Sequence, residues 1–148
     1  IIDYYVNPII QGVITMSRDL QTVNHVTYDC HYHIAWCTKY RLDLLKDGAD
    51  ERLKEIIHQV AQEFNASIEE LEIMEDHVYL VLSCYPHVTH KIVRMMKGRS
   101  SRVLREEFSF IKSRTPSLWT MKYCILTDNG DNVSNIVQQY VEAQELRG

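Results

Sequence analysis

The apolar residues of this chain recur with two spacings, and each spacing predicts one kind of element. Steps of three and four residues indicate helices that bury one face. Segments rich in aromatic and β-branched residues indicate strands. In chain order the predicted elements are a strand 26–41, a helix 50–65, strands 67–74 and 77–85, a helix 89–107 with Thr89 as N-cap, a loop 108–117, a strand 118–127, a turn 128–131 containing Gly130, and a helix 132–146.

This order reads βαββαβ followed by one further helix, which predicts an α+β protein with a ferredoxin-like fold. Its antiparallel sheet would carry two helices on one face, and the extra C-terminal helix would carry Tyr140. Residues 21–148 are predicted to form a single domain, and residues 1–20 an N-terminal extension without a functional role. The same fold serves many unrelated functions, so it does not settle the function.

The composition is that of an ordinary globular domain and excludes few functions. The chain has 148 residues and a formal net charge of −4. No apolar run reaches the roughly 20 residues that a membrane-spanning helix needs, so no membrane association is expected. The four cysteines form no CxxC pair, which predicts free thiols and a reducing, cytoplasmic location.

The charge is unevenly distributed, and one predicted helix is strongly basic. Residues 88–105 hold six basic residues and no acidic one. Gly98 falls within the basic stripe, where a missing side chain would let a phosphate backbone approach closely. A solvated helix face is the plain alternative, although such faces usually mix both signs. Lys91, Arg94, Arg102 and Arg105 share the stripe with Gly98, Lys97 and Arg99 flank it, and all six cations are predicted to bind nucleic-acid phosphates.

The final predicted helix carries a tyrosine on its apolar side. A phenol is a weak nucleophile near its free pKa of about 10, so it needs a base or a metal nearby. An apolar stripe is more often core, and a tyrosine at the edge of that core is the plain alternative. The residues that helical spacing places together are Val133, Ile136, Val137, Tyr140 and Gln144.

Histidines on two predicted strands are the remaining candidates. His77 and Tyr79 project from the same face of their strand, whereas Val78 points into the core. Two imidazoles at such a spacing would make a metal site, but here only one is present, as on many exposed sheet faces. On the first strand, alternation places Tyr32, Ile34 and Trp36 on one face and His31, His33 and Cys37 on the other.

Several of these segments occur together in a known family. The chain resembles the single-strand tyrosine transposases of small bacterial and archaeal insertion sequences, the TnpA type of the HUH superfamily, insertion-sequence 200/605 group. The resemblance covers nearly everything after residue 25. The matching blocks, in family order, are YHIAWCTKYR at 32–41, MEDHVYLVLS at 74–83, KIVRMMKGRSSRVL at 91–104, LWTMKY at 118–123 and NVSNIVQQYVEAQ at 132–144.

The resemblance implies a role for each candidate residue. Tyr140 would attack single-stranded DNA and form a 5′-phosphotyrosine link, with Mg²⁺ or Mn²⁺ polarising the phosphate. His77 matches the first histidine of the HUH pair, and Gln144 matches the additional metal ligand. The basic helix would hold the DNA, commonly a hairpin. Such proteins are homodimers with shared active sites, and Gly130 lies where the tyrosine helix would hinge.

The chain departs from the family at one position, because Tyr79 stands where the second metal-binding histidine is expected. A neutral phenol is a poor ligand for Mg²⁺. The site is therefore weakened but working, or disabled in a relative that still binds hairpin DNA, or altered by substitution. A further hypothesis is that His31 or His33 supplies the missing nitrogen. An RNA-binding module of similar fold is a more distant alternative, but it needs aromatic residues on its central strands.

Overall fold

The computed structural model describes residues 21–23, 26–127 and 133–144. The chain divides into two compact units, Ile1–Cys30 and His31–Gly148. In the first unit, β1 (Gln21–Val23) and β2 (Val26–Tyr28) pair as an antiparallel hairpin. The assignment of residues 1–20 to an extension stays a prediction. None of the described helices has the length and apolar character to cross a membrane.

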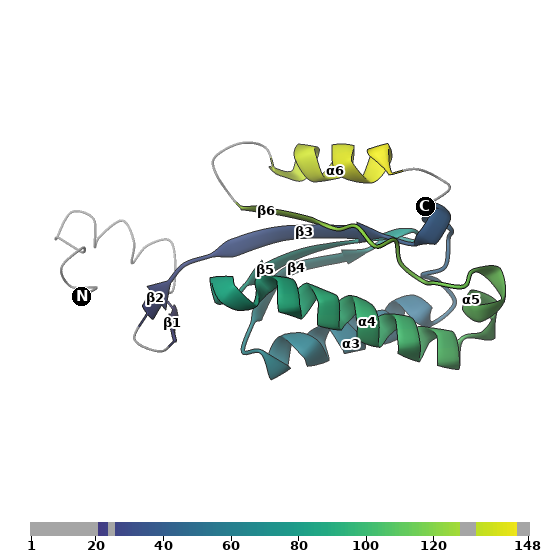
Figure 1. The fold of residues 1–148 in the computed structure, drawn as a ribbon, viewed down its shortest axis with the longest axis horizontal. Coiled ribbons are helices and arrows are strands. Elements are labelled where there is room, and N and C mark those ends of the chain that lie inside the picture. The colour runs from purple at the N-terminus through teal and green to yellow at the C-terminus, as the bar shows by residue number, and fades with distance from the viewer. Residues whose placement is uncertain (1–20, 24–25, 128–132, 145–148) are drawn as a thin grey trace. The chain divides into compact units, whose positions relative to one another are not determined.

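The second unit is built on a four-stranded antiparallel sheet (Figure 1). Its strands are β3 (His31–Cys37), β4 (Ser67–Ile73), β5 (His77–Ser83) and β6 (Cys124–Thr127), in the order β4-β5-β3-β6. The first and third strands of this unit therefore lie side by side at its centre. This order confirms the ferredoxin-like α+β fold that the sequence predicts.

Helices cover both faces of the sheet (Figure 1). On one face lie α3 (Ala49–Glu63) and α4 (Thr89–Glu107), with Trp36, Ile92 and Met96 among the fully buried side chains. On the other face lies α6 (Val133–Ala143), whose Val133, Val137 and Val141 pack on Ala35 and Cys37 of β3. The predicted alternation along the first strand is thus confirmed, because Trp36 and Cys37 belong to different cores.

The predicted strand 26–41 is wrong in its extent. It separates into β2 and β3, and it ends in the short 3-10 helix η1 (Lys39–Arg41). Tyr40 and Arg41 have left-handed backbones, with φ of 58° and 52°, which stop an extended strand. A second 3-10 helix, η2 (Pro86–Val88), precedes α4.

Three smaller predictions around α4 also need correction. Thr89 is the first residue of α4 instead of its N-cap, and its hydroxyl donates to the carbonyl of Pro86. The predicted loop 108–117 contains the helix α5 (Ser109–Arg114). The predicted strand 118–127 is regular only over β6, and the carbonyls of residues 120–122 accept hydrogen bonds from Lys97 instead of from a neighbouring strand.

Candidate functional site

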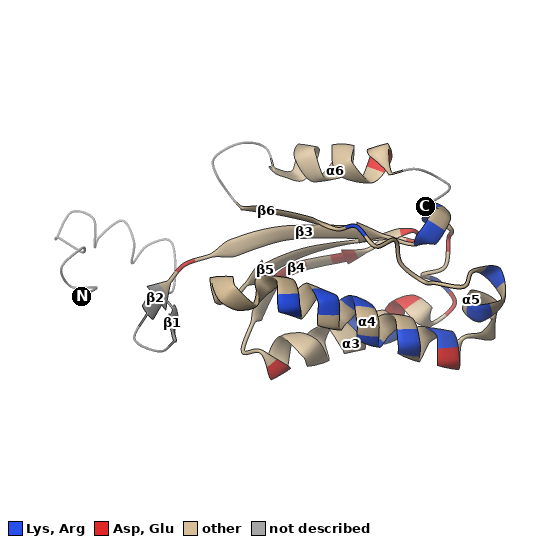
Figure 2. Ribbon diagram, in the orientation of Figure 1, with Lys and Arg blue, Asp and Glu red and all other residues tan. Residues whose placement is uncertain are grey.

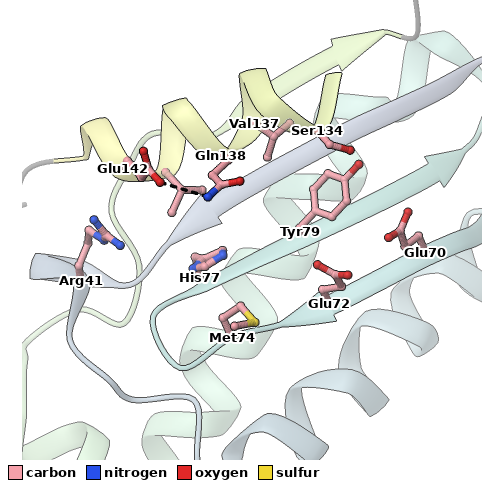
Figure 3. Close-up of a pocket in the computed structure, with 11 residues that line it drawn as sticks. Arg41, Glu70, Glu72, Met74, His77, Tyr79, Ser134, Val137, Gln138 and Glu142 are labelled. Atoms are coloured by element: carbon pink, nitrogen blue, oxygen red, sulfur yellow. Dashed lines mark hydrogen bonds between the residues drawn. The ribbon is translucent and has the colours of Figure 1, made fainter. Parts of the chain in front are cut away.

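A cavity of about 500 Å³ lies between α6 and the β5–β4 half of the sheet (Figure 3). The strands contribute His77 and Tyr79 from β5 and Glu70 and Glu72 from β4, and Arg41 lies at its edge. The helix contributes Ser134, Gln138 and Glu142 from one flank. The sheet therefore places the predicted metal-strand residues side by side, facing the C-terminal helix.

The imidazole of His77 is held in place from one side. Its Nδ1 donates to Oδ1 of Asp76 at 2.7 Å, and the other carboxylate oxygen accepts from Arg41 at 3.1 Å. Because Nδ1 is used in this way, Nε2 is the nitrogen left to meet a ligand. Asp76 and Arg41 were not identified from the sequence. Asp76 precedes His77 directly and could have been noticed, whereas no pattern pointed to Arg41.

Tyr79 does not present its hydroxyl as an isolated ligand. The hydroxyl shares a hydrogen bond of 2.7 Å with Nδ1 of His33, and the two rings stack with centroids 6.1 Å apart. The side chain is only 9% exposed. The position of the expected second histidine is therefore occupied by a tyrosine whose hydroxyl is hydrogen-bonded to His33 on the neighbouring strand β3.

Neither His31 nor His33 lies where it would complete a site with His77. The backbone partner of His33 is Val81, four residues from His77 along β5, or about 13 Å. His31 is paired further along the strand, and its Nδ1 contacts the Glu69 carboxylate at 2.6 Å. The hypothesis that one of them supplies the missing nitrogen has no support from this geometry.

Tyr140 lies over the other half of the sheet. Its half-buried ring packs against the core that the α6 valines form with Ala35 and Cys37 of β3. Burial, with smaller contributions from the neighbouring thiols of Cys37 and Cys124, raises the pKa of Tyr140 to about 12. Tyr140 does not line the cavity beside His77. In this arrangement α6 presents its Ser134–Gln138–Glu142 flank to His77, and the phenol faces away.

Gln144 is also apart from His77. Its amide donates to the carbonyl of Tyr140 at 3.1 Å, and the side chain does not line the cavity. Ile136, predicted on the same face, is 41% exposed, because the packed stripe is Val133, Val137 and Val141. The predicted face is confirmed at Val133, Val137 and Tyr140, and it is wrong at Ile136, whose place in the packed stripe is taken by Val141.

The side chains around the cavity are of the types that bind a hard divalent cation, but they do not come together as a metal site. Carboxylate and amide oxygens with one imidazole match the preferences of Mg²⁺ and Mn²⁺. Within the described ranges, however, no three His, Cys, Asp or Glu residues are grouped as a metal site. Of the predicted ligands, only His77 and Tyr79 lie at the cavity, and the Tyr79 hydroxyl is engaged by His33.

A second concave surface lies on α4, along the basic bands in Figure 2. Gly98 lines it, and a Cβ added there would meet nothing within 4 Å. Packing therefore does not require this glycine, although glycine inside a helix costs about 0.5–1 kcal/mol relative to alanine. The side chains around it are Lys91, Arg94, Met95, Arg99 and Arg102.

The six predicted DNA-binding cations divide into two sets. Three are used within the fold. Lys97 donates to the carbonyls of Thr120, Met121 and Lys122, and burial lowers its pKa to about 8. Arg99 pairs with Glu63, and Arg105 donates to the carbonyl of Thr115.

The other three cations face solvent along the Gly98 surface. Lys91 lies over the Phe64 ring at 5.8 Å. Arg102 is 63% exposed, and its guanidinium lies 3.8 Å from the Glu106 carboxylate, which makes a weak surface ion pair. Arg94 has no hydrogen bond or ion pair to any residue in the described parts of the chain. The geometry therefore favours Lys91, Arg94 and Arg102 over Lys97, Arg99 and Arg105 as ligands for a polyanion.

The fold is shared with solved structures of transposases. The structure of a REP-associated tyrosine transposase bound to a REP hairpin aligns with a TM-score of 0.55 over 79% of this chain and 68% of that one, at 10% identity. A 1.90 Å crystal structure of a protein from Deinococcus radiodurans R1 aligns with a TM-score of 0.74 and 34% identity, covering 84% and 98% of the two chains.

Sequence relationships place the chain more narrowly. Residues 26–144 match the family described as "Transposase IS200 like". The chain is 33% identical over 120 residues to the ISDra2 transposase TnpA of Deinococcus radiodurans, covering 79% of this chain and 85% of that protein. It is 28% identical over 129 residues to the IS200 transposase of Salmonella typhimurium, covering 85% and 84%. The protein belongs to the IS200-like transposase family.

Proposed function

We propose that this transposase cleaves and rejoins single-stranded DNA at insertion-sequence ends, with Tyr140 as the nucleophile. The Tyr140 oxygen would form a bond to phosphorus while the bond to the 3′ oxygen of the leaving strand breaks. The phenol proton passes to solvent, and the released 3′ oxygen takes up a proton, so that the released strand ends in a 3′-hydroxyl. The observation that carries the proposal is that α6, which carries Tyr140, packs on the sheet face from which His77 of β5 projects.

The homodimer with shared active sites belongs to this proposal. In this arrangement Tyr140 lies near the thiols of Cys37 and Cys124 and does not line the cavity, whereas Ser134, Gln138 and Glu142 of α6 line it together with His77. Tyr140 and His77 therefore meet only if α6 turns or comes from a second copy of the chain. The predicted hinge at Gly130 lies outside the described residues.

A divalent cation, Mg²⁺ or Mn²⁺, is the proposed cofactor. Three of the cavity residues are glutamates, Glu70, Glu72 and Glu142, opposed by Arg41. A phosphodiester entering this lining meets mostly negative charge, which a cation would offset while withdrawing charge from the phosphate. His77 would hold the cation through Nε2, and Gln144 would join it after α6 moves or is exchanged.

The proposed substrate is DNA that forms a hairpin, held on the Gly98 surface of α4. Lys91, Arg94 and Arg102 supply the charge, and Gly98 leaves room for a sugar–phosphate backbone. A structural neighbour binds a REP hairpin, which agrees with this assignment at the level of the fold. A cytoplasmic location is also proposed, and the four free cysteines support it.

A DNA-binding relative with a disabled metal site is the second candidate. The observation that favours it is the Tyr79–His33 hydrogen bond, because it replaces a metal-binding imidazole with an engaged phenol. An RNA-binding module is not favoured, since α6 packs over the sheet face that would stack bases.

The proposal is tested with purified protein and single-stranded hairpin DNA from its element's ends, with Mn²⁺ or Mg²⁺, on a denaturing gel. A protease-sensitive DNA adduct that disappears in Tyr140→Phe is the expected result. Tight hairpin binding without any adduct would favour the second candidate instead.

A further inference from the structure

A chain of hydrogen bonds joins Arg41, Asp76 and His77 at the edge of the cavity. Each oxygen of the Asp76 carboxylate serves one partner: Oδ2 accepts from Arg41 at 3.1 Å, and Oδ1 from Nδ1 of His77 at 2.7 Å. The three side chains are 21%, 26% and 22% exposed. Such partial burial strengthens charge-assisted hydrogen bonds and limits the number of side-chain orientations.

Backbone hydrogen bonds also hold the turn that contains Asp76, independently of the Arg41 side chain. The amide of Thr38 donates to the carbonyl of Asp76 at 2.9 Å, and its hydroxyl donates to the carbonyl of Leu42 at 2.7 Å. The amide of Leu45 donates to the carbonyl of Glu75 at 2.9 Å. The turn between β4 and β5 is therefore bound on both sides by the segment 38–45. Asp76 cannot shift without breaking contacts that are separate from the Arg41 ion pair.

Arg41 reaches Asp76 through an unusual backbone. Tyr40 and Arg41 are consecutive non-glycine residues in the left-handed region, where a Cβ is disfavoured. The Nε of Arg41 is buried without a hydrogen-bond partner in the described parts of the chain. Such local costs persist where the surrounding structure imposes them, and they cluster at functional sites. Here they accompany the alignment of one guanidinium with one carboxylate.

We propose that Arg41 and Asp76 are positioning residues that keep the proton of neutral His77 on Nδ1 and its lone pair on Nε2, toward the cavity. The carboxylate accepts only from a protonated Nδ1, so it selects that tautomer and fixes the ring plane. Arg41 holds the carboxylate in the accepting orientation. The functional meaning rests on the proposed function, because a ligand or phosphate at the cavity would use Nε2. The tautomer itself does not depend on that function.

The test is nitrogen NMR of the His77 ring in the full-length protein, without DNA or metal. A pH of about 8 keeps an ordinary histidine neutral. Wild type is expected to show the Nδ1–H form. Asp76→Ala should move His77 toward the Nε2–H form, while Asp76→Asn, which keeps a carbonyl acceptor, should retain more of the native form. Asp43→Ala is the matched control, since Asp43 pairs with Lys46 and Arg114 and not with His77.

An Nε2–H form in wild type, or no change in Asp76→Ala, would overturn the proposal. If Asp76→Ala does not fold, Arg41→Gln leaves the carboxylate in place and should still give a mixture of tautomers. An unchanged Nδ1–H form in that variant would show that Arg41 does not help to position His77.

Adduct formation separates this inference from the proposed function. A fall of about 10–100-fold in Asp76→Ala, with hairpin affinity unchanged, is expected. A tautomer shift in a protein that never forms an adduct would refute the proposed function alone. A wild-type adduct without any tautomer shift would refute the positioning role alone.

Discussion

Tyr79 and His33 face each other across β5 and β3, with the tyrosine hydroxyl 2.7 Å from Nδ1 of the histidine. The bond occupies the position where the family resemblance expects a second metal-binding imidazole. A phenol tied to a neighbouring strand offers little to a hard cation. The departure at position 79 is thus a change in local chemistry within an otherwise retained fold.

Restoring histidine at position 79 is expected to strengthen metal binding. Tyr79→His adds a second imidazole on the same strand face as His77, so Mn²⁺ affinity and the rate of adduct formation should both rise by about tenfold or more. Titration of the protein with Mn²⁺, followed by the gel assay, measures both. Tyr79→Phe is the control: it removes the hydroxyl, keeps the ring, and should leave Mn²⁺ affinity unchanged. Lower adduct formation in Tyr79→His would contradict this interpretation.

Gly98→Ala is expected to change stability and DNA binding in opposite directions. Alanine should raise the free energy of unfolding by about 0.5–1 kcal/mol, because its Cβ meets nothing in the fold. The same methyl group should weaken hairpin affinity by obstructing a close phosphate. Denaturant unfolding and a binding titration measure the two effects. Gln59→Ala, at an exposed position on α3, should leave affinity unchanged; equal affinity in Gly98→Ala would argue against a close approach of DNA.

Neutralising Arg94 and neutralising Lys97 should have different consequences, although each removes one charge from α4. Arg94→Gln should weaken hairpin binding and reduce the salt slope by about 1, since one phosphate contact is lost. Lys97→Gln should lower the free energy of unfolding by roughly 1–3 kcal/mol, because three carbonyls lose their donor. Salt-dependent binding and denaturant unfolding distinguish the two. Equal losses of affinity in both variants would show that Lys97 also contacts DNA.

The burial of Tyr140 should make stability depend on alkaline pH. Its pKa is raised from 10.0 to about 12, so the unfolded chain loses this proton first as the pH rises. The stability that the neutral phenol contributes is complete below pH 10 and is lost as the pH rises toward 12. Across this pH range, the free energy of unfolding should fall less steeply in Tyr140→Phe than in wild type. Parallel curves would indicate that Tyr140 is solvated like a free tyrosine.

Local pattern was sufficient for much of the fold. The helices α3, α4 and α6 and the strands β4 and β5 follow the predicted segments closely, since each buries one periodic face. The strand 26–41 was overextended because composition cannot reveal that Tyr40 and Arg41 adopt left-handed backbones. Helix α5 was missed because a six-residue helix leaves almost no periodic signal.

The sequence by itself determined the family, the topology and the types of residue available for chemistry. Only the tertiary structure decided which of those residues meet. In the structure, Tyr79 is hydrogen-bonded to His33, and Lys97 donates to three backbone carbonyls. Tyr140 does not line the cavity beside His77. These outcomes depend on strand register and on the rotation of α6 about its axis. Both are set by packing between segments distant in sequence, which a local spacing of residues does not encode.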